Sequence, residues 1–172
     1  HLYHVAANGK IKRQITTGEY NVTRLYGMDA KNTLYYQSTE RSATERNIYS
    51  VRINGRSKRL LTDATGSHNA NFTNDFSLFI NSYSADGIPT VVTLRNKDGG
   101  IVRTLKTNER AAQALEKYTY NRKEFFTLET PSDGPLNAWM IKPVDFDEDK
   151  TYPMFMFVYG GPGSQTVMNS YD

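Results

Sequence analysis

The sequence predicts a mainly β protein: about two blades of a β-propeller, followed by a linker and the first strands of a second domain. Two observations indicate the propeller. A stretch of alternating apolar residues with a central turn recurs along the chain, and a second pair of short strands follows it. A third observation indicates the second domain, because the repeat stops near residue 107 and the chain later reaches a continuous apolar run.

The repeat is clearest between two segments whose first residues, Leu2 and Ile48, lie 46 positions apart. The segments read LYHVAANGKIKRQITTG and IYSVRINGRSKRLLTDA, and they share seven identical positions without a gap. A weaker third copy, VVTLRNKDGGIVRTL, covers residues 91–105. Four short strands in about 40–50 residues are typical of a propeller blade. Residues 1–107 are therefore expected to hold about two blades, to begin partway through one, and to belong to a larger ring.

Turn residues separate the predicted strands. The pairs Asn8-Gly9, Asn54-Gly55 and Asp98-Gly99 are predicted to form two-residue hairpin turns in which both residues have positive φ. The segments 29–32 and 74–77, which are rich in Asp and Asn, are predicted to turn between the other strand pairs.

A different organisation begins after residue 107. Residues 108–122 are predicted to be a linker with a short helix, and Asn108 is its candidate N-cap. Within 123–172, two strands over 123–130 and 136–143 are joined by a turn cluster at 131–134, and an acidic loop follows over 144–152. The run from Pro153 to Val158 is apolar on both faces, which predicts a strand buried on both sides in an α/β sheet.

Composition excludes several classes of site. The 21 Lys and Arg against 18 Asp and Glu give a net charge of +3, and the basic residues are scattered, so a nucleic-acid partner is not expected. The chain has no Cys, which removes disulfides and thiolate metal sites. No apolar run reaches the length of a membrane span, and the acidic loop lacks the spacing of a calcium loop. We therefore expect no cofactor, no metal and no membrane span in these residues.

Catalytic candidates are few. The sequence contains no G-x-S-x-G and no H-E-x-x-H motif. His1, His4 and His68 all lie in the repeat region, where we expect them to be surface or packing residues. Tyr159 is the remaining candidate, because it ends the apolar run just before Gly160, where the backbone of a sheet protein can approach a ligand. Its phenol either donates a hydrogen bond to a developing oxyanion or packs under the following loop.

The segment KTYPMFMFVYGGPGSQTV, residues 150–167, together with the preceding LNAWMIKPVDFD, resembles the first strands of the peptidase domain in the dipeptidyl peptidase IV family. This family is a branch of the prolyl oligopeptidase clan of serine peptidases. The upstream segment HLYHVAANGKIKRQITTGEYNVTRLYGMDAKNTLYYQSTE resembles the late propeller blades of the same enzymes. The resemblance covers essentially the whole chain.

The resemblance implies that residues 123–172 open an α/β-hydrolase domain capped by an eight-bladed propeller. It implies a Ser-Asp-His triad that removes N-terminal dipeptides, preferably after Pro or Ala, and it makes Tyr159 one oxyanion-hole donor. The triad is expected beyond residue 172, and the Glu pair that holds the substrate amine before residue 1. Ser164 is not expected to be the nucleophile, because it lacks the flanking glycines of a nucleophile elbow.

The resemblance therefore implies that the chain is an inactive fragment of an enzyme, and that the full enzyme acts on peptides with a free N-terminus. The family also implies a homodimer and a periplasmic or secreted location, with membrane association through a part outside these residues. Two alternatives stay open: an oligopeptidase or acylaminoacyl peptidase of the same clan, and a catalytically dead propeller that serves as a binding module.

Overall fold

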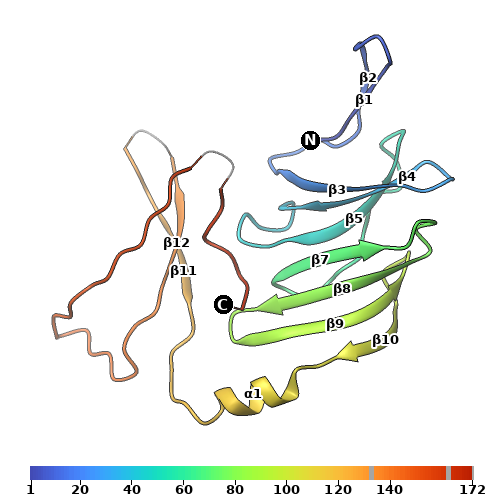
Figure 1. The fold of residues 1–172 in the computed structure, drawn as a ribbon. Helices are drawn as coiled ribbons and strands as arrows, with labels where there is room; N and C mark the ends of the chain where they lie inside the picture. The colour runs from blue at the N-terminus through green and yellow to red at the C-terminus, as the bar shows by residue number, and fades with distance from the viewer. Residues whose placement is uncertain (132–133, 162–163, 172) are drawn as a thin grey trace.

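The computed structural model describes residues 1–131, 134–161 and 164–171. Its strands form two four-stranded antiparallel sheets and two separate hairpins (Figure 1). The first hairpin joins β1 (Tyr3–Val5) and β2 (Ile11–Gln14). The first sheet contains β3 (Val22–Met28), β4 (Thr33–Ser38), β5 (Asn47–Arg52) and β6 (Arg59–Leu60). The second contains β7 (Ser67–Phe72), β8 (Leu78–Ala85), β9 (Ile88–Asn96) and β10 (Ile101–Lys106).

Both four-stranded sheets are meanders, because strands that follow one another in the sequence also pair in space. The sheets stack on each other (Figure 1), and a parallel bridge between Arg46 and Ser67 joins them. Four-stranded meanders stacked in this way are propeller blades. The predicted mainly β fold with about two blades is confirmed. The β1–β2 hairpin matches the outer pair β5–β6, as the 46-residue repeat predicts for the end of a preceding blade.

The three hairpin turns share one geometry, which differs from the predicted one. In each copy the glycine alone is left-handed, with φ of 82° at Gly9, 79° at Gly55 and 93° at Gly99. Each glycine N–H donates to the carbonyl three residues earlier, as in the 2.9 Å bond from Gly9 to Ala6. This is a three-residue loop, a type I turn followed by a left-handed residue. The prediction of two-residue turns with positive φ at both positions is therefore wrong.

The core lies between the blades. Aromatic rings fill the space where the first blade meets the second, with ring centroids 4.7 Å apart for Phe72 and Phe79 and 4.9 Å apart for Tyr35 and Phe72. Ile48 and Leu61 complete this cluster from the first blade's outer half. A second cluster, on the opposite face of the first blade, packs toward the β1–β2 hairpin. The first blade thus buries apolar side chains on both of its faces, and the second blade packs against one of them.

The linker helix α1 (Glu109–Leu115) begins at the predicted place with Asn108 at its N-cap position, but the Asn108 side chain makes no capping hydrogen bond. Asn108 is left-handed with φ of 56°, and its side-chain amide donates to the carbonyl of Thr90 on β9. The side chain therefore ties the start of the helix to the second blade instead of binding the helix's free N–H groups. Among the described residues, no helix has the length and hydropathy to cross a membrane.

A final hairpin follows the helix. Strand β11 (Glu124–Leu128) pairs with β12 (Leu136–Met140), and Lys142 forms an ion pair with Glu124 at 2.9 Å. The two predicted strands are thus confirmed; part of their turn cluster, residues 132–133, lies outside the described residues.

The predicted buried strand over 153–158 is wrong for this structure. These residues form no strand, and Phe155 is 92% exposed. A buried strand needs neighbouring strands for its backbone N–H and C=O groups and cover for its side chains. Among the described residues, no strand pairs with this segment.

Candidate functional site

Tyr159 lies in the irregular segment that follows β12, and 61% of its surface is exposed. The structure does not bring another sequence-predicted site residue to it: His1, His4 and His68 all belong to the blade region. Pro162 and Gly163, the rest of the glycine-rich turn, lie outside the described residues. Within this chain the phenol therefore faces solvent and remains available as a hydrogen-bond donor.

Two glycines after Tyr159 shape its immediate surroundings. A Cβ placed on Gly161 would lie 2.8 Å from the Tyr159 hydroxyl oxygen, whereas a Cβ on Gly160 would meet nothing within 4 Å. The tyrosine ring thus lies back over the Gly161 backbone, in space that a side chain would occupy. The carbonyl of Gly161 also accepts a 3.2 Å hydrogen bond from the Ser164 N–H.

The segment that carries Tyr159 is anchored to the blades at its far end. Figure 1 shows it ending beside the turn between β8 and β9. Asn169 makes three hydrogen bonds there: its N–H donates to the Thr44 carbonyl at 2.8 Å, its carbonyl accepts from the Ser67 hydroxyl at 2.9 Å, and its side-chain oxygen accepts from the Asp86 N–H at 2.9 Å. We call this set of contacts the Asn169 anchor.

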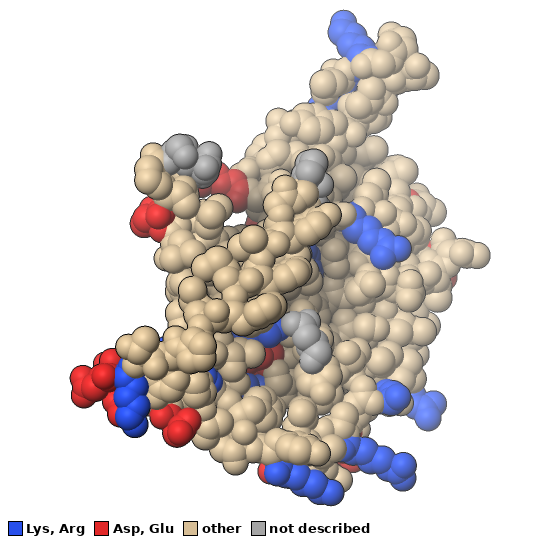
Figure 2. Space-filling view, turned by 60° about the vertical axis from the view of Figure 1, so that its left-hand side comes forward, with Lys and Arg blue, Asp and Glu red and all other residues tan. Residues whose placement is uncertain are grey.

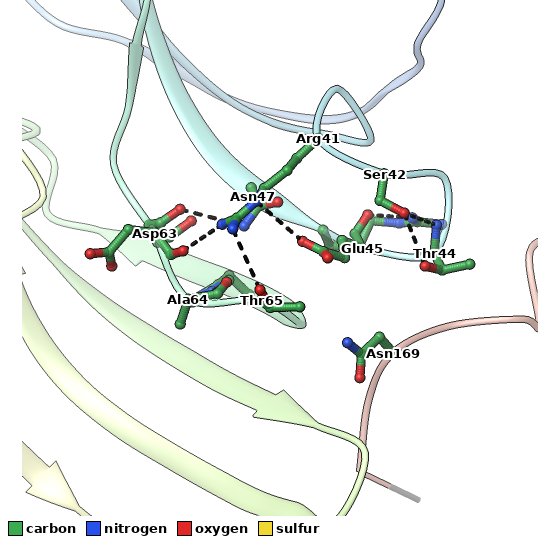
Figure 3. Close-up of polar contacts among 12 residues, drawn as sticks. Arg41, Ser42, Thr44, Glu45, Asn47, Asp63, Ala64, Thr65 and Asn169 are labelled. Atoms are coloured by element: carbon green, nitrogen blue, oxygen red, sulfur yellow. Dashed lines mark hydrogen bonds and ion pairs between the residues drawn. The ribbon is translucent and has the colours of Figure 1, made fainter. Parts of the chain in front are cut away.

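A polar loop of the first blade supports the anchor (Figure 3). The Arg41 guanidinium donates to the Asp63 carbonyl and to the Thr65 hydroxyl at 3.4 Å, and its Nε lies 3.8 Å from the Glu45 carboxylate. The hydroxyl of Ser42 bonds to that of Thr44 at 3.0 Å. The loop that presents the Thr44 carbonyl to Asn169 is thus fixed from both sides by side chains.

His68 is the most deeply buried histidine, with 1% of its surface exposed. Its Nε2 lies 2.9 Å from the Ala64 carbonyl, its Nδ1 lies 3.2 Å from the Asn81 side-chain oxygen, and its ring stacks on Tyr83. Burial lowers the pKa of His68, although the hydrogen bonds to Ala64 and Asn81 oppose the shift. The packing role expected for this histidine is therefore the one it has: a buried ring that joins two strands of the second blade.

No three His, Asp or Glu side chains gather into a metal-binding group in the described parts of the chain. The acidic loop is held by its own contacts, since Lys150 pairs with Asp147 at 3.0 Å and the Asp147 N–H donates to the Tyr152 hydroxyl. Lys and Arg are dispersed over the face shown in Figure 2 and form no single patch there.

Sequence reasoning missed the Asn169 anchor. Ser67 and Asn169 are 102 residues apart, and neither stands in a motif. The sequence changes locally from a periodic to an irregular pattern, but this change does not indicate which residues Asn169 would contact.

Comparisons with known proteins agree on one family. The family described as "Dipeptidyl peptidase IV (DPP IV) N-terminal region" matches residues 1–90. A curated relative from Emericella nidulans, named "Probable dipeptidyl peptidase 4", is 33% identical over 170 residues, which cover 97% of this chain and 22% of the relative. A protein of the same name from Aspergillus fumigatus is 31% identical over 99% of this chain and 23% of its own length.

A solved structure extends the similarity to the whole fold. The crystal structure of Porphyromonas gingivalis dipeptidyl peptidase 4 matches with a TM-score of 0.92 and 40% sequence identity, and the match covers 100% of this chain and 24% of that one. The chain thus spans about a quarter of the length of the proteins it matches. The similarity includes the irregular segment that carries Tyr159, as well as the blades.

Proposed function

Because the chain belongs to the dipeptidyl peptidase IV family, we propose that it is part of a serine exopeptidase that removes N-terminal dipeptides, preferably after Pro or Ala. The observation that carries the proposal is the match along the full chain, at 40% identity, to a solved dipeptidyl peptidase 4. The similarity at this identity extends beyond the fold, which supports an activity of the full-length molecule shared with that protein.

In this proposal residues 1–107 are the last blades of the propeller, 108–122 are the linker, and 123–172 open an α/β-hydrolase domain. Residues 153–158 then become a strand of that domain's sheet once neighbouring strands cover them. Their fully apolar character supports this, because strands that are buried on both faces have such sequences.

Tyr159 is the proposed catalytic residue of the chain. Its phenol would donate a hydrogen bond to the oxyanion that forms when the nucleophilic serine attacks the scissile carbonyl. Two features support this role: the hydroxyl is free of protein partners among the described residues, and the segment that carries it is anchored to the blades at Asn169. A backbone N–H beside the serine would be the second donor, and the triad lies outside these residues.

In this proposal the triad lies outside the 172 residues, so the isolated chain is inactive. The propeller would limit access to the site, so that short peptides with a free N-terminus enter and folded proteins do not. A homodimer and a periplasmic or secreted location, with membrane association through a part outside these residues, complete the proposal; these follow from the family resemblance.

The test is an assay of the full-length protein with a Gly-Pro chromogenic amide. The proposal expects release of the chromophore from this substrate and no release when its amino group is acetylated. Cleavage of the acetylated substrate instead would indicate an oligopeptidase or acylaminoacyl peptidase. A folded protein that cleaves neither substrate would indicate a binding module and would overturn the proposed enzyme.

A further inference from the structure

An open cavity of about 360 Å³ lies between the two blades, beside the Asn169 anchor. Two arginines are among the residues that line it, Arg24 of β3 and Arg46 just before β5, together with Tyr83 and Met168. No Asp or Glu of the described residues lines the cavity. Its volume is within the range of small-molecule sites, about 300–1,000 Å³.

Arg46 is a buried cation without a carboxylate partner among the described residues. Only 9% of its surface is exposed, and its Nη1 donates to the carbonyls of Ala43 at 3.0 Å and Glu45 at 2.7 Å. Its Nε and Nη2 make no hydrogen bond to the described residues, and Arg46 is one of the residues that line the cavity. The Glu45 carboxylate approaches Arg41 instead (Figure 3).

The contrast with Arg95 shows that this arrangement is unusual within the chain. Arg95 is also buried, but its guanidinium bonds to two carbonyls and to Thr93, and the charge of Asp63 acts on it. Burial lowers the pKa of Arg46 with no acidic group to oppose the shift. A buried cation is costly unless an anion compensates it, so the cavity favours an anionic occupant.

Arg24 adds a second positive charge at the rim. It is exposed, and its guanidinium lies 5.3 Å from the centroid of the Tyr26 ring, with one nitrogen 3.5 Å from the Asn69 side-chain oxygen. These contacts are long enough to leave the group free to turn toward a ligand. Guanidinium groups bind carboxylates through paired hydrogen bonds, which gives geometric selectivity as well as attraction.

We propose that this cavity binds the carboxylate of a short peptide, with Arg46 at its floor and Arg24 at its rim. The volume exceeds what an isolated inorganic anion fills, and Tyr83 and Met168 offer apolar contact to the organic part of such a ligand. The site goes beyond the proposed cleavage reaction and does not depend on it, because binding alone is claimed.

Calorimetric titration of the full-length protein tests the site. The probes are N-acetyl-Gly-Pro with a free carboxylate, its C-terminal amide, and inorganic phosphate. The acetyl group removes the amino group that an exopeptidase site would recognise. We expect the free acid to bind at least about tenfold more tightly than the amide, which corresponds to about 1.4 kcal/mol.

Arg46→Met is expected to weaken binding of the acid about tenfold, and Arg24→Gln about threefold. Arg59→Gln is the matched control, because Arg59 is an exposed arginine that pairs with Asp98 at 2.7 Å away from the cavity. If Arg46→Met does not fold, Arg24→Gln decides alone. Equal affinity for acid and amide, binding of phosphate only, or unchanged affinity in the arginine variants would overturn the proposal.

Discussion

The Ser67 hydroxyl on β7 donates a 2.9 Å hydrogen bond to the main-chain carbonyl of Asn169, 102 residues further along the chain. Asn169 also bonds to Thr44 and Asp86, so both blades contact the segment that carries Tyr159. The blades in this arrangement therefore fix one end of a segment that also carries the proposed oxyanion donor.

Asn169→Ala in the full-length protein should lower stability by about 1 kcal/mol, because the Asp86 N–H loses its acceptor. Asn169→Asp keeps an acceptor oxygen at the same place and should retain most of the stability. Chemical unfolding of both variants measures the difference. Equal losses in the alanine and aspartate variants would show that the side-chain bond does not contribute.

Two glycines next to Tyr159 form a matched pair for activity. Gly161→Ala places a methyl group 2.8 Å from the Tyr159 hydroxyl and must displace the ring, whereas Gly160→Ala meets nothing within 4 Å. Turnover of the full-length enzyme should fall at least about tenfold in the first variant, through partial loss of one oxyanion donor, and change little in the second. Similar turnover in both variants would contradict the proposed position of the ring.

Two repeat-related turns form a matched pair for stability. Gly9 and Gly99 are both left-handed, so alanine at either costs about 1 kcal/mol. Alanine at Gly99 would also place its Cβ 2.5 Å from the Leu61 carbonyl oxygen, while at Gly9 it meets nothing within 4 Å. Gly99→Ala should therefore lower the unfolding midpoint clearly more than Gly9→Ala. The reverse order would show that the turns are not packed as described.

His68 should make the blades sensitive to acid. Burial lowers its folded-state pKa below the ordinary value of 6.5, so the unfolded chain binds the proton more readily. The contribution of this histidine to stability is complete above pH 6.5 and is lost as the pH falls from there toward the folded-state pKa. His68→Gln should flatten the dependence of the unfolding midpoint on pH between 7 and 5. An unchanged slope would mean that His68 does not titrate on unfolding.

Local features of the fold could be predicted from the sequence. The positions of the turns at Asn8-Gly9 and Asn54-Gly55 can be predicted from the sequence, but the predicted positive φ at both residues is wrong, because only the glycines are left-handed. The type depends on how the flanking strands pair: the carbonyl of Ala6 accepts from Gly9, which makes the loop one residue longer than the two-residue form.

Long-range contacts could not be predicted. Asn is a residue type that often caps helices through its side chain. In the folded chain, however, the Asn108 side-chain amide donates a hydrogen bond to the carbonyl of Thr90. The apolar run that ends at Val158 has the composition of a buried strand, but a strand requires partners that the described residues do not contain. In both cases the conformation depends on groups that are distant in the sequence. The local residue pattern does not identify those groups.

The central claim is that Tyr159 donates a hydrogen bond to the oxyanion, and kcat of the full-length Tyr159→Phe variant tests it most directly. Phenylalanine keeps the ring and removes the donor, and the exposed position leaves folding nearly unchanged. We expect kcat for a Gly-Pro chromogenic amide to fall about 10²–10³-fold, with an unchanged unfolding midpoint. A kcat within a few-fold of the unmodified enzyme would contradict the assignment.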